Sequence, residues 1–207
     1  MDILVELDTP SLMQIVQTLT TSLDSLEAEV SSQASYALDF FATYYVRNVK
    51  KDSPAMTALR RHLAAQPQLF EALMKLVFHV VVFGEIGRSW SLPKPLLSLI
   101  LAAELVRPNV RATPRAAAAP RARARARRHA FAPHPLPPPF SVSLQVFEEF
   151  KNEVVAMQPG DVQQRMQDEF QKLMKDITRS LDPVNRDRFQ NRITIFLVSV
   201  REFAKIL

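Results

Sequence analysis

Apolar side chains recur at helical spacing along most of this chain. Between residues 10 and 29 the apolar positions lie three or four residues apart: Leu12, Ile15, Val16, Leu19, Leu23 and Leu26. This spacing is typical of an amphipathic helix that turns one stripe toward a core. Thr9 is a common capping residue type and precedes a proline at the first helical position. We therefore expect a first helix from Pro10 to Glu29, capped by Thr9.

The same spacing predicts further helices. The second of them begins after Ser31-Ser32. Residues 67–83 are apolar almost all round, which indicates a helix buried on most sides. The segments with helical spacing after the first are residues 34–49, 54–65, 67–83, 93–105 with a resumption at 146–158, 162–177 and 183–203.

About seven helices joined by short turns, several of them marked by proline, predict an all-α fold. Only three glycines are present, which disfavours a many-stranded sheet, and 47% of the residues are apolar, which is enough for a sizeable core. We expect helical hairpins stacked as HEAT-type repeats in an α-solenoid. A compact helical bundle is the alternative, because no strict sequence period relates the segments.

One segment, residues 106–145, differs in composition from the rest. It holds eight prolines and eight arginines, and no acidic residue occurs between Glu104 and Glu148. Without these arginines, 18 basic residues face 21 acidic ones, so the basicity of the chain belongs to this segment. Such a composition cannot bury enough apolar surface to offset the entropy of ordering it. We expect a disordered basic insertion at 106–145 between helical-repeat segments 1–105 and 146–207 of one domain.

The insertion has the form of a translated intron. Residues 137–145 can be written as a pyrimidine-rich tract that ends in CAG, like the 3′ end of an intron, and Val106-Arg107 can be written like a 5′ splice donor. Removing residues 106–145 joins Leu105 to Val146 without a phase break in the helical pattern. A natural loop is the alternative, and transcripts that span this region would distinguish the two.

The residues offer little for catalysis or metal binding. The chain has no cysteine, which excludes thiolate zinc sites and a cysteine nucleophile, and no glycine-rich phosphate loop. His62 and His79 lie in predicted helices, and we interpret them as a surface and a packed histidine, respectively. His129 and His134 lie in the insertion without acidic partners. We therefore expect no metal and no cofactor.

Paired acidic residues do not change this interpretation. Glu148-Glu149 and Asp168-Glu169 are neighbours along helices, so their side chains point to different sides, which is poor geometry for an acid and a base acting together. We expect them on solvated faces. With no catalytic residue to assign, the sequence indicates a protein that is not an enzyme.

Two further sets of residues are interpreted as packing. Trp90, the single tryptophan, is expected to fill the gap between two hairpins, with a hot spot for a partner as the alternative. The methionines at 157, 166 and 174 have the spacing of helix fillers. The apolar stretch Leu69–Phe83 is too short to cross a bilayer and the N-terminus lacks the pattern of a signal peptide, so we expect a soluble intracellular protein.

Four motifs recur in a known protein family: Gln66-Pro67-Gln68-Leu69, Val80-Val81-Val82-Phe83, Arg88-Ser89-Trp90-Ser91-Leu92-Pro93-Lys94-Pro95-Leu96-Leu97 and Asn185-Arg186-Asp187-Arg188-Phe189. They resemble the C-terminal end of the exportin-7 (Ran-binding protein 16) family, nuclear transport receptors of the importin-β superfamily. The resemblance covers about residues 30–105 and 146–207.

The resemblance implies a partner-binding helical scaffold that belongs to a longer receptor. Such a receptor binds cargo proteins and Ran-GTP, passes nuclear pore proteins and shuttles between nucleus and cytoplasm. The Ran contacts of the superfamily lie in N-terminal repeats, so no Ran-binding residue is assigned here, and no cargo-binding residue is assigned either. The alternative is a generic helical scaffold or adaptor whose basic insertion binds nucleic acid without sequence preference.

Overall fold

The computed structural model describes residues 6–84, 91–106, 141–175, 177–178 and 180–203, and these residues form helices and connecting turns without strands. Trp90 and residues 107–140 of the expected insertion lie outside the described residues. The described part contains eight helices, where about seven were expected. They are α2 (Thr9–Leu23), α3 (Ala28–Asn48), α4 (Pro54–Ala65), α5 (Leu69–Phe83), α6 (Lys94–Val106), α7 (Ser141–Ala156), α8 (Gly160–Met174) and α9 (Pro183–Phe203).

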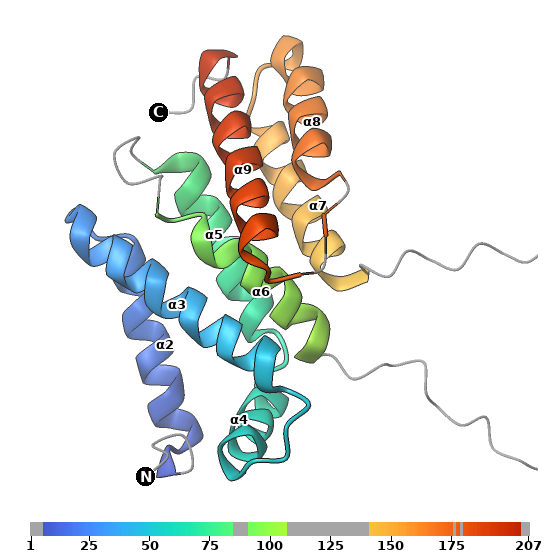
Figure 1. The fold of residues 1–207 in the computed structure, drawn as a ribbon. Coiled ribbons are helices and arrows are strands. Elements are labelled where there is room, and N and C mark those ends of the chain that lie inside the picture. Colours follow the sequence, from blue (N-terminus) through green and yellow to red (C-terminus); the bar gives the residue numbers. More distant parts are fainter. Residues whose placement is uncertain (1–5, 85–90, 107–140, 176, 179, 204–207) are drawn as a thin grey trace, which may run out of the picture.

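The helices stack in two layers (Figure 1). In one layer α5 lies between α2 and α7, and in the other α6 lies between α3 and α9. The helix α8 packs against α7 and α9, and the pairs α2–α3, α5–α6 and α8–α9 form hairpins. The predicted all-α fold of HEAT-type helical repeats is therefore confirmed.

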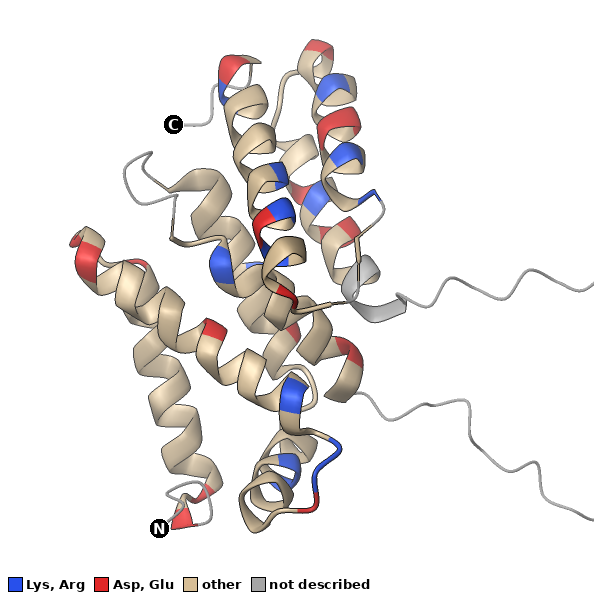
Figure 2. Ribbon diagram, in the orientation of Figure 1, with Lys and Arg blue, Asp and Glu red and all other residues tan. Residues whose placement is uncertain are grey.

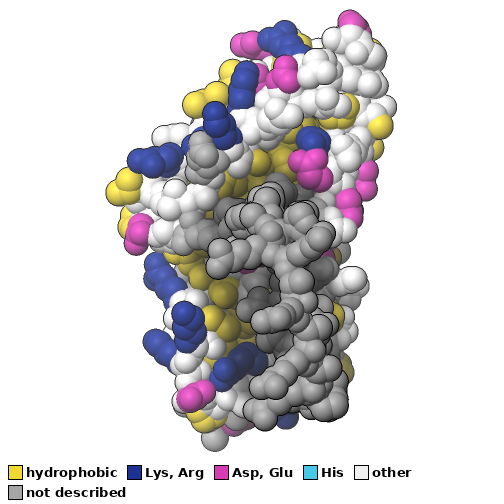
Figure 3. Space-filling model, turned by 90° about the vertical axis from the view of Figure 1, so that its right-hand side faces the viewer, with side chains coloured by type: hydrophobic (Ala, Val, Ile, Leu, Met, Phe, Trp, Pro, Cys, Tyr) yellow, Lys and Arg dark blue, Asp and Glu magenta, His cyan; other side chains and the backbone are white. Residues whose placement is uncertain are grey.

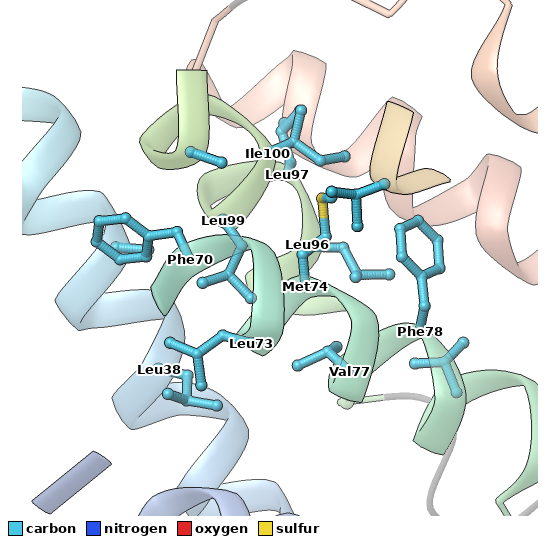
Figure 4. Close-up of a cluster of buried hydrophobic side chains, with 14 of the residues drawn as sticks. Leu38, Phe70, Leu73, Met74, Val77, Phe78, Leu96, Leu97, Leu99 and Ile100 are labelled. Carbon is cyan, nitrogen blue, oxygen red and sulfur yellow. The ribbon is translucent and has the colours of Figure 1, made fainter. Parts of the chain in front are cut away.

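The centre of the molecule is the apolar contact of α3, α5 and α6 (Figure 4). The helix α5, expected to be buried on most sides, places Phe70, Leu73, Met74, Val77 and Phe78 in this core, each 2% exposed or less. A second cluster of aromatic rings extends the core to the C-terminal helices. Ring centroids lie 4.8 to 6.2 Å apart along the series Phe78, Phe147, Phe150, Phe170 and Phe196.

The boundary between the first two helices differs from the prediction. The helix α2 ends at Leu23, and α3 begins at Ala28. Leu26 continues the apolar spacing but is 84% exposed, so that spacing misplaced the end of the helix. Ser31, expected before the second helix, lies inside α3 and is fully buried, because a small side chain fits a close helix contact and its hydroxyl donates to the Ala28 carbonyl, 3.1 Å away.

The cap of α2 is also one residue earlier than predicted. Asp8 is the N-cap, and its Oδ1 accepts a hydrogen bond from the Ser11 backbone N–H at 2.8 Å. Thr9 begins the helix and uses its hydroxyl elsewhere, with Nδ1 of His62 on α4 at 2.6 Å. Asp8 therefore satisfies an N–H group at the helix start, and Thr9 ties α2 to α4.

The helices on either side of the expected insertion are antiparallel neighbours. The start of α5 lies beside the start of α7, because Gln68 and Glu71 line one pocket together with Gln145. Further along both helices, Lys75 pairs with Glu149 and Glu153. The helix α6 returns along α5, so α6 ends and α7 begins on the same side of the molecule (Figure 1). With residues 107–140 present, α6 and α7 are therefore two separate antiparallel helices.

The edges of the expected insertion are helical rather than disordered. Val106 is the last residue of α6, and residues 141–145 form the first part of α7. The last proline of the segment is Pro139, and no residue after it prevents a helix. The segment between the two helices is thus residues 107–140.

Candidate partner-binding surface

A polar junction joins α3, α6 and α9. Asp39 on α3 forms an ion pair with Arg186 at the start of α9, and Ser98 on α6 donates a hydrogen bond to the same carboxylate at 2.7 Å. The Arg186 guanidinium also donates to the Thr43 hydroxyl at 3.3 Å. The side chains of Asp39 and Arg186 are 19% and 25% exposed, so the pair is shielded from most solvent. It fixes the start of α9 over α6 and against α3.

Beside this junction lies an open groove along α3. Its lining includes Tyr36, Phe40, Tyr44 and Arg47 on α3 and Arg186 on α9, and its volume is about 770 Å³. The four α3 residues recur every three or four positions and form one stripe, opposite the stripe that faces the core. Phe40 is 74% exposed and Tyr36 is 44% exposed. We call this surface the α3 groove.

The charge at the α3 groove is mainly basic. Arg47 is exposed, and it makes no hydrogen bond or ion pair within the part of the chain that the structure describes. It also lines a neighbouring pocket of about 250 Å³ between the start of α6 and the start of α9. Lys and Arg residues occur at the end of α3 and along the first turns of α9 (Figure 2). Figure 3 shows them along the left margin, the side that faces the reader in Figure 1, with hydrophobic side chains beside them.

One wall of the α3 groove is held by a lysine at the start of α6. The Lys94 ammonium donates to the Tyr36 hydroxyl at 2.5 Å and lies 4.1 Å from the centre of the Tyr36 ring. This contact combines a hydrogen bond with a cation–π interaction. It fixes the orientation of Tyr36 and covers one face of its ring.

The two helical histidines have the opposite environments to those expected. His62 is 8% exposed and bonds to Thr9, whereas His79, in the most apolar helix, is exposed and rests against the ring of Phe83 at 4.8 Å. His79 is exposed although its helix is highly apolar, because it lies on the one side of α5 that faces solvent. His129 and His134 lie outside the described residues.

The acidic pairs are only partly as expected. Asp168 is exposed, but Glu169 is 8% exposed and pairs with Lys172 at 2.6 Å, so its placement on a solvated face is wrong. Glu148 pairs with Lys151, and Glu149 lies 3.3 Å from Lys75 across the α5–α7 contact. The two members of each pair contact different partners and do not form an acid–base site.

Two of the three methionines pack as expected. Met166 is fully buried and Met174 packs on the core, but Met157 is 66% exposed, because it lies at the turn after α7. No group of three or more His, Asp or Glu side chains that could hold a metal occurs among the described residues. None of the described helices is long and apolar enough to cross a membrane.

Known proteins match the chain over nearly its whole length. It is 22% identical to Ran-binding protein 17 of Homo sapiens and 24% identical to Ran-binding protein 17 of Mus musculus, in each case over 98% of this chain and 16% of the relative. It is 22% identical to Exportin-7-B of Xenopus laevis, over 99% of this chain and 16% of the relative. No family model matches the chain, and no solved structure matches it.

The chain therefore spans about a sixth of the length of the curated relatives that it matches. Identity is low, but the matches agree with one another and run from one end of the chain to the other. They agree with the resemblance that the motifs predicted: over nearly its whole length the chain is similar to Ran-binding protein 17 and exportin-7.

Proposed function

We propose that this chain is part of a nuclear transport receptor, in which it acts as a helical scaffold that binds a protein partner. The observation that supports the proposal is the match to Ran-binding protein 17 and exportin-7 along nearly the whole chain. The stacked helices and the α3 groove supply a surface of the kind such a scaffold needs.

The proposal extends to the partners and location of the complete receptor. The names of the relatives indicate Ran binding and export for those proteins. In this proposal the complete receptor would bind Ran-GTP and export cargo, and it would contact nuclear pore proteins as it moves between nucleus and cytoplasm. This chain would correspond to the C-terminal repeats, with the Ran contacts elsewhere. No enzymatic step is part of the proposed function.

A chimera tests the proposal. The matched segment of Xenopus laevis Exportin-7-B is replaced by this chain, and the nuclear-to-cytoplasmic ratio of a cargo of the unmodified receptor is measured in permeabilised cells with and without Ran-GTP. We expect Ran-GTP-dependent export by the chimera and none by a receptor that lacks the segment. A chimera that is folded, as judged by circular dichroism, but inactive would contradict the proposal.

A further inference from the structure

We propose that the α3 groove binds an acidic segment of a protein partner that also carries apolar side chains. The inference rests on the proposed scaffold function and adds the class of partner and the residues that contact it. Its two components are the exposed aromatic rings of α3 and the unpaired guanidinium at the end of the stripe.

The aromatic component provides the apolar part of the binding. Phe40 exposes 74% of its surface beside Tyr36 and Tyr44 on one open stripe. Large exposed apolar groups that gather in a groove are uncommon on a surface without a partner, and tyrosine, tryptophan and arginine are the residues that most often dominate binding energy. A leucine or phenylalanine of a partner would remove these rings from water.

The charged component selects an acidic partner. Of the cations at the groove, Arg186 is already paired with Asp39, and Lys94 is held by Tyr36. Arg47 has no partner in the described part of the chain and is exposed beside the aromatic stripe. A guanidinium in this position matches a carboxylate with two parallel hydrogen bonds. A partner with Asp or Glu next to its apolar side chains is therefore the best complement.

Stacking of a further helical hairpin on this end of the array is less well supported. A stacked hairpin would cover α2 as well as α3, and both helices would then expose apolar stripes. The exposed residues of α2 are mostly polar: Gln14, Gln17, Thr18 and Thr21, with Pro10 and Ile15 as the apolar exceptions. The aromatic exposure is confined to α3, which fits a ligand in a groove better than a stacked repeat.

Single-stranded nucleic acid is also a weaker fit. Base-stacking surfaces need free ring faces and several cations that follow the phosphate backbone. One face of Tyr36 is covered by Lys94, and Asp39 and Asp187 stand among the cations of the two adjoining pockets. The surface has too little net positive charge for a phosphate backbone.

The test uses the full chain and three short fluorescein-labelled peptides of equal length. Their repeating sequences are Glu-Leu-Asp-Phe, Lys-Leu-Arg-Phe and Glu-Ser-Asp-Ser, and binding is followed by fluorescence anisotropy. The eight arginines between residues 107 and 128 would attract any acidic peptide. The Glu-Ser-Asp-Ser peptide measures this charge-only attraction, and the comparison between variants isolates the groove.

We expect the Glu-Leu-Asp-Phe peptide to bind tightest. Phe40→Ser and Arg47→Glu should each weaken its binding roughly five- to tenfold, because each removes one of the two components. The controls Ile195→Ser, at another exposed apolar residue, and Arg61→Glu, at another exposed arginine, should leave it unchanged. Thermal unfolding of each variant establishes that it is folded.

Three results would overturn the inference: equal binding of the basic peptide, loss of binding in the controls as large as in the groove variants, or tighter Arg47-dependent binding of a single-stranded RNA. Concentration-dependent self-association that Phe40→Ser abolishes would assign the groove to a second copy instead. The peptide assay needs no transport activity. An active chimera with no groove-dependent peptide binding overturns this inference alone, whereas groove-dependent binding with an inactive chimera overturns only the transport function.

Discussion

Asp8 stabilises the start of α2 through its negative charge. Its pKa lies below the ordinary value of 3.8 because it accepts hydrogen bonds from Ser11, and the positive end of the helix adds to this effect. A lowered pKa means that the folded state holds the proton less tightly than the unfolded state. The stabilisation is therefore present above the ordinary pKa of 3.8 and is lost as the pH falls through the lower pKa of the folded state.

Substitutions of Asp8 test the direction in which stability changes with pH. Asp8→Ala should lower the melting temperature at neutral pH, and Asp8→Asn should lower it less, because an amide oxygen can still accept from Ser11. Both variants should lose part of the acid dependence that we expect for the wild type as the pH falls below about 5. The measurement is thermal unfolding by circular dichroism across this range. Identical pH profiles for all three proteins would contradict the role of Asp8.

The ion pair of Asp39 and Arg186 is predicted to couple α3 to α9. Alanine substitutions at each position and at both, followed by urea unfolding, give the coupling free energy, which we expect to be about 1–2 kcal/mol for a pair so shielded from solvent. The matched control is the pair of Asp52 and Arg60, 3.5 Å apart, in which the aspartate side chain is fully exposed. It should show no measurable coupling. Equal coupling free energies in the two pairs would contradict the predicted coupling of α3 to α9 by Asp39 and Arg186.

At the scale of helices, the aromatic cluster decides how firmly α8 is held. Phe170 is fully buried and contacts Phe147, Phe150 and Phe196 on two other helices. Phe170→Ala should lower the free energy of unfolding by about 3–5 kcal/mol, because it removes buried surface and leaves a cavity. Phe40→Ala, the same change at a residue that is 74% exposed, should alter it by no more than about 0.5 kcal/mol. Urea unfolding of both variants tests this, and similar losses would contradict it.

Helical spacing predicted which segments form helices but not where each one ends. The apolar stripes identified the segments because the core selects residues at that spacing. Leu26 kept the spacing and yet is exposed after the end of α2, and the antiparallel return of α7 depends on packing against α5, which one segment's pattern does not contain. Ends and directions of helices are set by contacts between segments.

The α3 groove could have been predicted from the spacing of aromatic residues in the sequence. Helix α3 carries two apolar stripes: one is the core stripe, and the other runs through Tyr36, Phe40 and Tyr44 to Arg47. A second aromatic stripe on one helix indicates a second contact surface. The pairing of Asp39 with Arg186 could not be predicted, because the two residues lie 147 positions apart.

For the whole molecule, the arrangement of α6 and α7 predicts that residues 107–140 can be removed. The two helices run antiparallel and meet the segment on the same side of the molecule (Figure 1), and the described core contains residues from both sides of it. Replacing 107–140 by a short Gly-Ser linker should preserve the helical circular dichroism and the melting temperature, and should abolish salt-dependent binding to RNA. Loss of cooperative unfolding in this variant would show that the segment supports the fold.

The contact between α3 and α9 also determines how the array responds to force. In a helical-repeat array each unit touches only its neighbours, so the array can extend gradually, like a spring. Here Arg186 reaches past α6 to Asp39, and the two ends of the described layer are bridged. Pulled at its ends, this part of the chain would resist until the bridge breaks, and would then yield abruptly. The position of the α3 groove relative to α9 would therefore change at the point where Arg186 loses Asp39 and Thr43.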